Sequence, residues 1–249
     1  MAVNDTPSPP PSPPLVSTLD VPLNLLVDID GTLAITDRLY LLAFQDLMRP
    51  FGYTEVDEAW FEKHVAGKVD AEVFGALLPA GATAEVIEAT SRQKDAIFVQ
   101  KVASVGATIV PGLADALHMA RRCGWRCIAV TNAQRGGGQA VLDLLRRELG
   151  EGLASVIEDL VVGCECSRAK PHPDPYLEAM RRLGVAPEHC IVFEDSGTGV
   201  RAGAAAKVAA VVGIRTSLTD AALCAAGADA TVADWSELSE AKLRELAAR

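Results

Sequence analysis

Long apolar runs and an excess of basic residues are both absent from this 249-residue sequence. No apolar stretch approaches the roughly 20 residues that a membrane-spanning helix needs. Lys and Arg number 23 against 33 Asp and Glu, which gives a net charge of −10. Nucleic acid or an anionic membrane surface favours a basic face on its partner. We therefore expect neither of them to be the main partner of this chain.

The first residues also lack the charged and apolar regions of a secretory signal. The segment 1–22 instead contains seven prolines with Ser and Asp between them, which predicts an extended, disordered tail. Targeting segments for organelles are usually Arg-rich and acid-poor, and this tail is neither. We expect a cytoplasmic protein, with a plastid location left open.

Cysteine is sparse, at six residues. A long chain without a secretion signal favours reduced thiols, which we expect to be mostly buried. Cys164 and Cys166 lie close enough in sequence to contact a metal or to become oxidised. No second Cys or His pair stands at zinc-finger spacing, so the sequence does not predict a zinc site.

Short apolar runs alternate with amphipathic helical stretches along most of the chain. This alternation predicts a parallel sheet covered by helices on both faces, a doubly wound, Rossmann-like α/β core. Ligands of such sheets bind beyond the carboxyl ends of the strands, a rule that selects Asp28, Thr131 and Asp195. The predicted strands are Leu23–Ile29, Arg126–Thr131, Leu160–Gly163, Cys190–Phe193, Ala209–Val212 and Ala230–Val232.

Residues 37–107 contain helical periodicity almost throughout, which predicts an all-helical cap inserted into a core of residues 23–36 and 108–249. A further helix is expected to start in the glycine run at 136–138, which is either a flexible connector or a close approach to an anion. The helices predicted in the cap are Arg38–Phe51, Val56–Val65, Ala71–Leu78 and Ala84–Val105.

Two carboxylates one residue apart, Asp28 and Asp30, follow the first strand. Such charges repel each other, so a nearby cation or a raised pKa normally accompanies them. The segment is also compatible with an ordinary Asp-Gly turn. A second acidic pair, Glu194 and Asp195, follows a later strand, where Asp195 or Ser196 can also cap the next helix. Four carboxylates at one sheet edge predict a Mg²⁺ site.

Polar groups suited to phosphate follow other strands. Thr131 and Asn132 end the second predicted strand, where a hydroxyl, an amide and the N–H groups of the next turn can bind phosphate oxygens. Lys170 precedes three alternating prolines, which predict a stiff, extended loop. The helix that follows is expected to be capped by Asp174, with Pro175 in its first position.

The order Asp-x-Asp-Gly-Thr, Thr-Asn, Lys and Glu-Asp over residues 23–232 resembles the haloacid dehalogenase-like hydrolase superfamily. The helical insertion is similar to the cap of the group that holds β-phosphoglucomutase, phosphoglycolate phosphatase and small sugar phosphatases. Five segments resemble plant-type sugar phosphatases of broad range: Ala43-Phe44-Gln45, Ala66-Gly67-Lys68, Ala129-Val130-Thr131-Asn132-Ala133, Lys170-Pro171-His172-Pro173 and Val192-Phe193-Glu194-Asp195-Ser196.

By this resemblance Asp28 is the nucleophile that forms an aspartyl-phosphate, and Asp30 protonates the leaving oxygen and then activates water. Mg²⁺ is expected to contact Asp28, the backbone carbonyl of Asp30, and Asp195, with Glu194 as a direct or an indirect ligand. The resemblance also implies the substrate-binding residues: Thr131, Asn132 and Lys170 for the phosphate, and Gly67 and Lys68 in the cap.

The implied activity is a Mg²⁺-dependent phosphatase for small sugar or polyol phosphates, and we expect a monomer that binds a small phosphorylated metabolite. A phosphoglycolate-type phosphatase, a phosphomutase and a catalytically silent binding protein are the alternatives. Tyr40 stands where β-phosphoglucomutases carry histidine, which disfavours the mutase. Ile35 stands where relatives often carry aspartate, so contacts inferred near residues 35–40 transfer less directly.

Overall fold

The computed structural model of the protein describes residues 22–65 and 68–248. The predicted Pro-rich tail, residues 1–22, lies outside this part of the chain except for its last residue. Gly67, predicted in the cap loop, also lies outside it.

A six-stranded parallel sheet forms the centre of the core, in the order β5-β4-β1-β6-β7-β8. Each predicted strand is present, with ends that differ by up to three residues. Because β1 lies between β4 and β6, three of the predicted motifs become neighbours. The strands are β1 Asn24–Val27, β4 Arg126–Thr131, β5 Ile157–Val162, β6 Cys190–Glu194, β7 Ala210–Ile214 and β8 Ala230–Val232.

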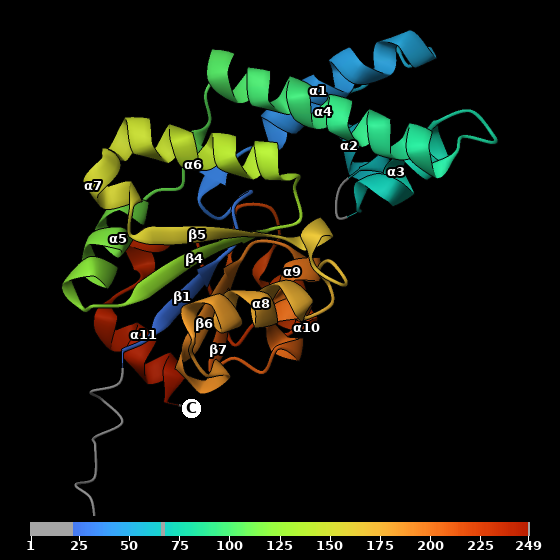
Figure 1. The fold of residues 1–249 in the computed structure, drawn as a ribbon. Helices are drawn as coiled ribbons and strands as arrows, with labels where there is room; N and C mark the ends of the chain where they lie inside the picture. The colour runs from blue at the N-terminus through green and yellow to red at the C-terminus, as the bar shows by residue number, and fades with distance from the viewer. Residues whose placement is uncertain (1–21, 66–67, 249) are drawn as a thin grey trace, which may run out of the picture.

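Helices cover both faces of this sheet (Figure 1). Successive strand residues point to opposite faces: Leu25 packs with one buried cluster and Leu26 with the other. The predicted doubly wound core is therefore confirmed. One face carries α5 Leu113–Arg122, α6 Arg135–Leu149, α7 Glu151–Ala154 and α11 Glu240–Ala247; the other carries α8 Asp174–Leu183, α9 Gly197–Ala205 and α10 Asp220–Ala226.

The segment between β1 and β4 contributes an inserted all-helical cap, as predicted. Its helices share a buried apolar cluster of their own that includes Phe44, Met48 and Phe74. Asp57 and Thr83 cap two of these helices by accepting backbone N–H groups. The boundaries at 36/37 and 107/108 stay a prediction. The cap helices are α1 Asp37–Met48, α2 Glu58–His64, α3 Asp70–Leu77 and α4 Ala84–Ser104.

A short antiparallel ribbon joins the two ends of the cap, and the sequence did not predict it. Strand β2, Ala34–Ile35, pairs with β3, Thr108–Ile109. Strands of two residues show no detectable periodicity, so their pairing is visible only in three dimensions.

Two local predictions need correction. The glycine run at 136–138 is the first turn of α6 and not a flexible connector, and the anion it approaches is the carboxylate of Asp95 from α4. The loop after Lys170 is not extended throughout, because Pro173 already has helical φ/ψ of −72° and −11°. Asp174 is the first residue of α8 and not its cap; its carboxylate pairs with Arg168.

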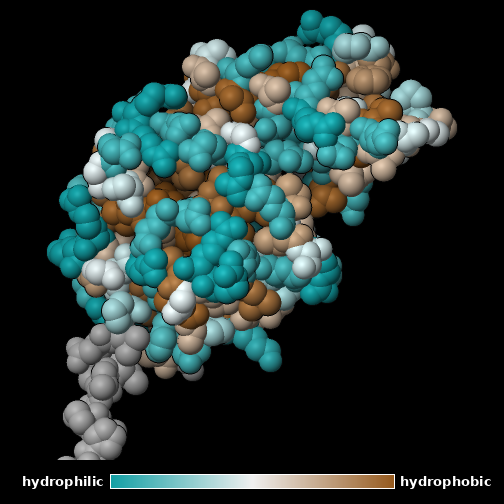
Figure 2. Space-filling model, in the orientation of Figure 1, coloured by the Kyte–Doolittle hydropathy of each residue, from teal (hydrophilic) through white to brown (hydrophobic). Residues whose placement is uncertain are grey.

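The cysteines are free thiols, but they are less buried than expected. Cys127 and Cys190 are buried, whereas Cys164 and Cys224 are exposed, so the prediction of mostly buried thiols is wrong for that second pair. Among the described residues, no helix is both long and apolar enough to cross a membrane. Figure 2 shows hydrophilic side chains over much of the visible face, with smaller apolar patches between them.

Candidate active site

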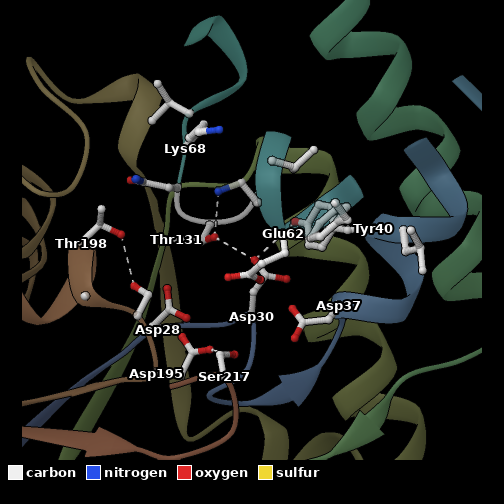
Figure 3. Close-up of a pocket in the computed structure, with 18 of the residues that line it drawn as sticks. Asp28, Asp30, Asp37, Tyr40, Glu62, Lys68, Thr131, Asp195, Thr198 and Ser217 are labelled. Atoms are coloured by element: carbon white, nitrogen blue, oxygen red, sulfur yellow. Dashed lines mark hydrogen bonds between the residues drawn. The ribbon is translucent and has the colours of Figure 1, made fainter. Parts of the chain in front are cut away.

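The carboxyl edge of the central strands opens into a cavity of about 810 Å³ between the core and the cap. Asp28 directly follows β1, Thr131 ends β4 and Glu194 ends β6. Parallel neighbours necessarily bring their carboxyl ends to the same edge. Figure 3 shows Asp28, Asp30 and Asp195 close together in this cavity.

Lys170 lies at the centre of the buried charges and is 3% exposed. Its Nζ donates to Asp28 Oδ1 at 2.6 Å, to Glu194 Oε1 at 2.7 Å and to the carbonyl of Val130 at 2.7 Å. Burial disfavours the charged lysine, but the two carboxylates outweigh this effect and raise the pKa of Lys170. The lysine therefore remains a cation and compensates two buried acids.

The carboxylate of Glu194 is fully buried, and each of its oxygens has a donor. Tyr176 donates to Oε1 at 2.7 Å beside Lys170, and the Ser196 hydroxyl donates to Oε2 at 2.9 Å. Gly199 leaves space for this arrangement, since a Cβ there would lie 1.7 Å from Glu194 Oε1. Ser196 also caps α9, as one of the two sequence alternatives predicted.

The carboxylates of Asp28, Glu194 and Asp195 fit a hard divalent cation. One oxygen of each lies within 4.8 Å of the others. Asp28 Oδ1 receives Lys170 and Asp195 Oδ2 receives Ser217, and within the described residues the other oxygen of each has no hydrogen-bond donor. Asp28 and Asp195 thus keep a ligand atom available, whereas Glu194 is committed to protein donors. Oxygen ligands of this kind suit Mg²⁺.

Electrostatic repulsion supports the same interpretation. Burial and the charge of Glu194 raise the pKa of Asp28, with Lys170 opposing the shift. Burial and the charge of Asp28 raise the pKa of Asp195. A single lysine does not neutralise three carboxylates, so a bound cation would stabilise their ionised forms.

Asp30 is held by hydroxyl groups on the cap side of the cavity. Thr36 Oγ1 donates to Asp30 Oδ1 at 2.7 Å, and Tyr40 OH donates to Oδ2 at 3.3 Å. The Tyr40 ring stacks on Phe98 at a centroid distance of 4.1 Å. Burial raises the pKa of Asp30, with the Thr36 hydrogen bond opposing the shift. A carboxyl with a raised pKa is suited to carry a proton near neutral pH.

Thr131 and Asn132 both line the cavity, but they differ in their contacts. Thr131 Oγ1 lies 3.5 Å from Asp30 Oδ2 and accepts the N–H of Ala133. The Asn132 amide donates to the carbonyl of Lys170 at 3.0 Å and accepts its N–H at 3.1 Å. Asn132 therefore anchors the loop of Lys170, and its contact with phosphate stays a prediction.

The cap contributes one predicted and one unpredicted lysine to the cavity lining. Lys68 is exposed, and its Nζ donates to the carbonyl of Lys63. Lys94 on α4 is buried, pairs with Asp70 at 2.8 Å and lies over the Tyr40 ring. Its position within a long amphipathic helix is typical of a solvated charge, so the sequence carried no signal for it. Tyr176 in α8 and Ser217 in the loop after β7 were also missed, because neither residue belongs to a recognisable motif.

Comparison with known proteins identifies the family. A family model for haloacid dehalogenase-like hydrolases matches residues 24–207. Protein CbbY of Rhodobacter capsulatus is 30% identical over 215 residues, which cover 85% of this chain and 90% of that protein. A phosphorylated carbohydrates phosphatase of Thermotoga maritima is 28% identical over 211 residues, with coverage of 84% and 93%. The crystal structure of CbbY from Rhodobacter sphaeroides in complex with phosphate has 26% identity and a TM-score of 0.73, with coverage of 88% and 97%.

The matched range contains the motif residues Asp28, Thr131, Lys170 and Asp195 and spans the cap helices. These relatives are bacterial proteins, so the narrower resemblance to plant-type sugar phosphatases stays a prediction. The chain belongs to the haloacid dehalogenase-like hydrolase family.

Proposed function

We propose that this protein is a Mg²⁺-dependent phosphatase that hydrolyses small sugar or polyol phosphates through an aspartyl-phosphate on Asp28. The observation that carries the proposal is the arrangement of Asp28. Lys170 holds one of its oxygens at 2.6 Å, the other has no hydrogen-bond donor among the described residues, and Asp30 and Asp195 line the same cavity. The names of the relatives, a phosphorylated carbohydrates phosphatase among them, support this reaction class.

In the proposed first step, an Asp28 oxygen attacks phosphorus and the bond to the sugar oxygen breaks. Asp30 donates its proton to that leaving oxygen, and Thr131 and Lys170 bind phosphate oxygens. In the second step, the ionised Asp30 takes a proton from water, which attacks the phosphorus and releases Asp28. Mg²⁺ held by Asp28, Asp195 and the Asp30 carbonyl would offset the negative charge of phosphate near the nucleophile.

The cap is proposed to enclose the sugar while the core holds the phosphate. Lys68 lines the cavity from the cap side, and Gly67 precedes it. Closure of a cap over the bound ester would exclude bulk water from the first step. The proposed ligand is therefore a small phosphorylated metabolite that fits within the cavity as a whole.

A phosphoglycolate-type phosphatase and a phosphomutase are the alternatives. A mutase must protect its phosphoenzyme until the sugar returns, and Tyr40 replaces the histidine that β-phosphoglucomutases carry at this position. The Tyr40 hydroxyl donates to Asp30 Oδ2 at 3.3 Å and so helps to orient the proposed acid and base.

The decisive experiment is a phosphate-release screen of the purified protein. Hexose, pentose, polyol and glycolate phosphates are incubated with and without Mg²⁺, and isomerised sugar phosphate is measured in parallel. We expect free phosphate from sugar phosphates, with no release by Asp28→Asn. Retained activity in Asp28→Asn would rule out the nucleophile assignment, isomerisation without release would favour the mutase, and no turnover by folded protein would favour a binding protein.

Lys68 is tested separately as a specificity residue. If it contacts the bound ester, Lys68→Ala lowers kcat/KM for several sugar phosphates while its melting temperature stays at the wild-type value. Lys63→Ala is a matched control, because Lys63 contributes only its carbonyl to the contact with Lys68. Unchanged kcat/KM in Lys68→Ala would contradict this role.

A further inference from the structure

The loop between β7 and α10 contacts both acidic motifs through two adjacent hydroxyl groups. Ser217 Oγ donates to Asp195 Oδ2, and Thr216 Oγ1 donates to the carbonyl of Gly31 at 2.6 Å. Figure 3 shows Ser217 directly beside Asp195 at the base of the cavity. This contact was not predicted from the sequence, since neither residue belongs to a predicted motif.

The core of the protein fixes the position of this loop at both ends. The N–H of Arg215 donates to the carbonyl of Val232 at 2.9 Å and so extends the pairing of β7 with β8. Thr219 caps α10 by accepting the N–H of Ala222 at 3.3 Å. The hydroxyls between these anchors therefore belong to the rigid sheet edge and not to the cap.

The contact between Ser217 and Asp195 is closely packed. Gly31 has φ of +74°, and a Cβ there would lie 2.0 Å from Asp195 Oδ2 and 3.0 Å from Ser217 Oγ. Within the described residues, Ser217 is the one hydrogen-bond donor to the Asp195 carboxylate. Asp195 is 5% exposed, so little bulk water is available to replace this donor.

We propose that Ser217 is a positioning residue for the metal ligand Asp195. Its hydroxyl holds Oδ2 and thereby leaves Oδ1 available for a cation that Asp28 and Asp195 would hold. Partners of this kind orient a ligating carboxylate, and their loss typically costs about 10- to 100-fold in metal affinity. The proposal rests on the proposed function, because it requires Mg²⁺ at Asp28 and Asp195.

The test is a calorimetric titration of Mg²⁺ into the metal-free protein without substrate. Ser217→Ala and Ser217→Val both remove the hydroxyl, whereas Ser217→Thr keeps it. Threonine and valine have the same shape, so this pair of variants differs only in the presence of the hydroxyl. We expect the Mg²⁺ Kd to rise about 10- to 100-fold in the alanine and valine variants and to remain near the wild-type value in the threonine variant. Thr219→Val removes a hydroxyl that faces α10 and controls for general loosening of the loop.

The outcomes separate this proposal from the proposed function. Wild-type Kd in Ser217→Ala and Ser217→Val, with Mg²⁺ binding intact, would overturn the positioning role alone. Absence of Mg²⁺ binding in the wild type would overturn both. Melting temperatures in EDTA are measured alongside: a lower melting temperature without a change in Kd would show that Ser217 is merely structural and would contradict the proposal.

Discussion

At the scale of single residues, Lys170 has the largest electrostatic role in the site. It is buried between Asp28 and Glu194, where bulk water does not solvate its charge. Removing one partner from a buried ionic group leaves uncompensated charge, which is far more costly than the loss of an exposed pair. Lys170 is therefore expected to matter for folding as well as for phosphate binding.

We predict that Lys170→Met lowers the free energy of unfolding by about 3–5 kcal/mol in the absence of metal. Methionine replaces most of the apolar part of the side chain but leaves Asp28 and Glu194 without their cation. Urea denaturation in EDTA measures the change. Arg168→Met is the control, because Arg168 pairs with Asp174 at the surface and its loss should change stability little. Equal effects of the two substitutions would contradict the prediction.

The thiols provide a second prediction for single residues. Burial raises the pKa of Cys190 to about 12, and it also raises the pKa of Cys127. Thiolate is the reactive form, so both should resist iodoacetamide at pH 8 in the folded protein. The exposed Cys164 and Cys224 should be labelled first. Peptide mass spectrometry before and after denaturation tests the order, and early labelling of Cys127 would be inconsistent with it.

At the scale of elements, the notable contact joins cap helix α4 to core helix α6. Asp95 Oδ1 accepts the N–H of Gly137 at 2.9 Å, and Gln134 donates to Ser91 at 3.1 Å. A carboxylate at a helix N-terminus satisfies a free N–H and interacts favourably with the helix dipole. Gly136 and Gly137 have no side chains, which allows the Asp95 carboxylate to reach the start of α6. The glycine run therefore allows cap helix α4 to pack against the core at this point.

We predict that Gly137→Ala lowers stability although alanine favours helix. A Cβ at this position would lie 2.7 Å from Asp95 Oδ1 and 3.2 Å from the Phe98 ring. The displaced carboxylate should cost about 1–3 kcal/mol, more than the gain of up to about 1 kcal/mol from helix propensity. Gly152→Ala in α7 is the control, because a Cβ there meets nothing within 4 Å. Thermal denaturation should show lower stability for Gly137→Ala and unchanged or higher stability for Gly152→Ala.

At the scale of the whole molecule, acidic charge accumulates where the core and the cap meet. The net charge of the chain is −10, and three buried carboxylates converge at the sheet edge. Any anionic ester must be attracted by local groups and not by the overall field. The described structure offers Lys170, Lys94 and the proposed cation site for this purpose.

We predict that saturating Mg²⁺ raises the melting temperature, because it binds the folded state. At 100 times Kd the gain is about 2.7 kcal/mol, or roughly 5–10 °C for a chain of this size. Differential scanning calorimetry with Mg²⁺ and with EDTA measures it, and Asp195→Asn should remove most of the difference. An equal gain in Asp195→Asn would mean that the cation binds elsewhere.

The stabilisation by Mg²⁺ should also grow with pH. The pKa values of Asp28 and Asp195 are raised in the folded, metal-free protein. Without metal, these two acids contribute favourably to the free energy of folding only while they are protonated. That contribution is present in full below the unfolded pKa, about 4, and is lost as pH rises through the folded pKa. Metal binding competes with these protons. The difference in melting temperature between Mg²⁺ and EDTA should therefore be larger at pH 7 than at pH 5, and a larger difference at pH 5 would contradict this sign.

The sequence by itself determined the six sheet strands, the four cap helices and the convergence of Asp28, Thr131 and Asp195, whereas the place of Lys170 in the site was implied by the family resemblance. These features depend on local periodicity and on the rule that parallel strands end at one edge, both of which can be read along the chain.

Only the tertiary structure decided which groups pair inside the site. The contacts of Ser217 with Asp195, of Tyr176 with Glu194 and of Asp95 with Gly137 join residues from different elements. The pairing of β2 with β3 likewise spans the whole cap. Such contacts depend on helix rotation, loop path and close packing, which the order of residue types does not specify locally. The chemistry was therefore predictable from motifs, whereas the groups that position it were not.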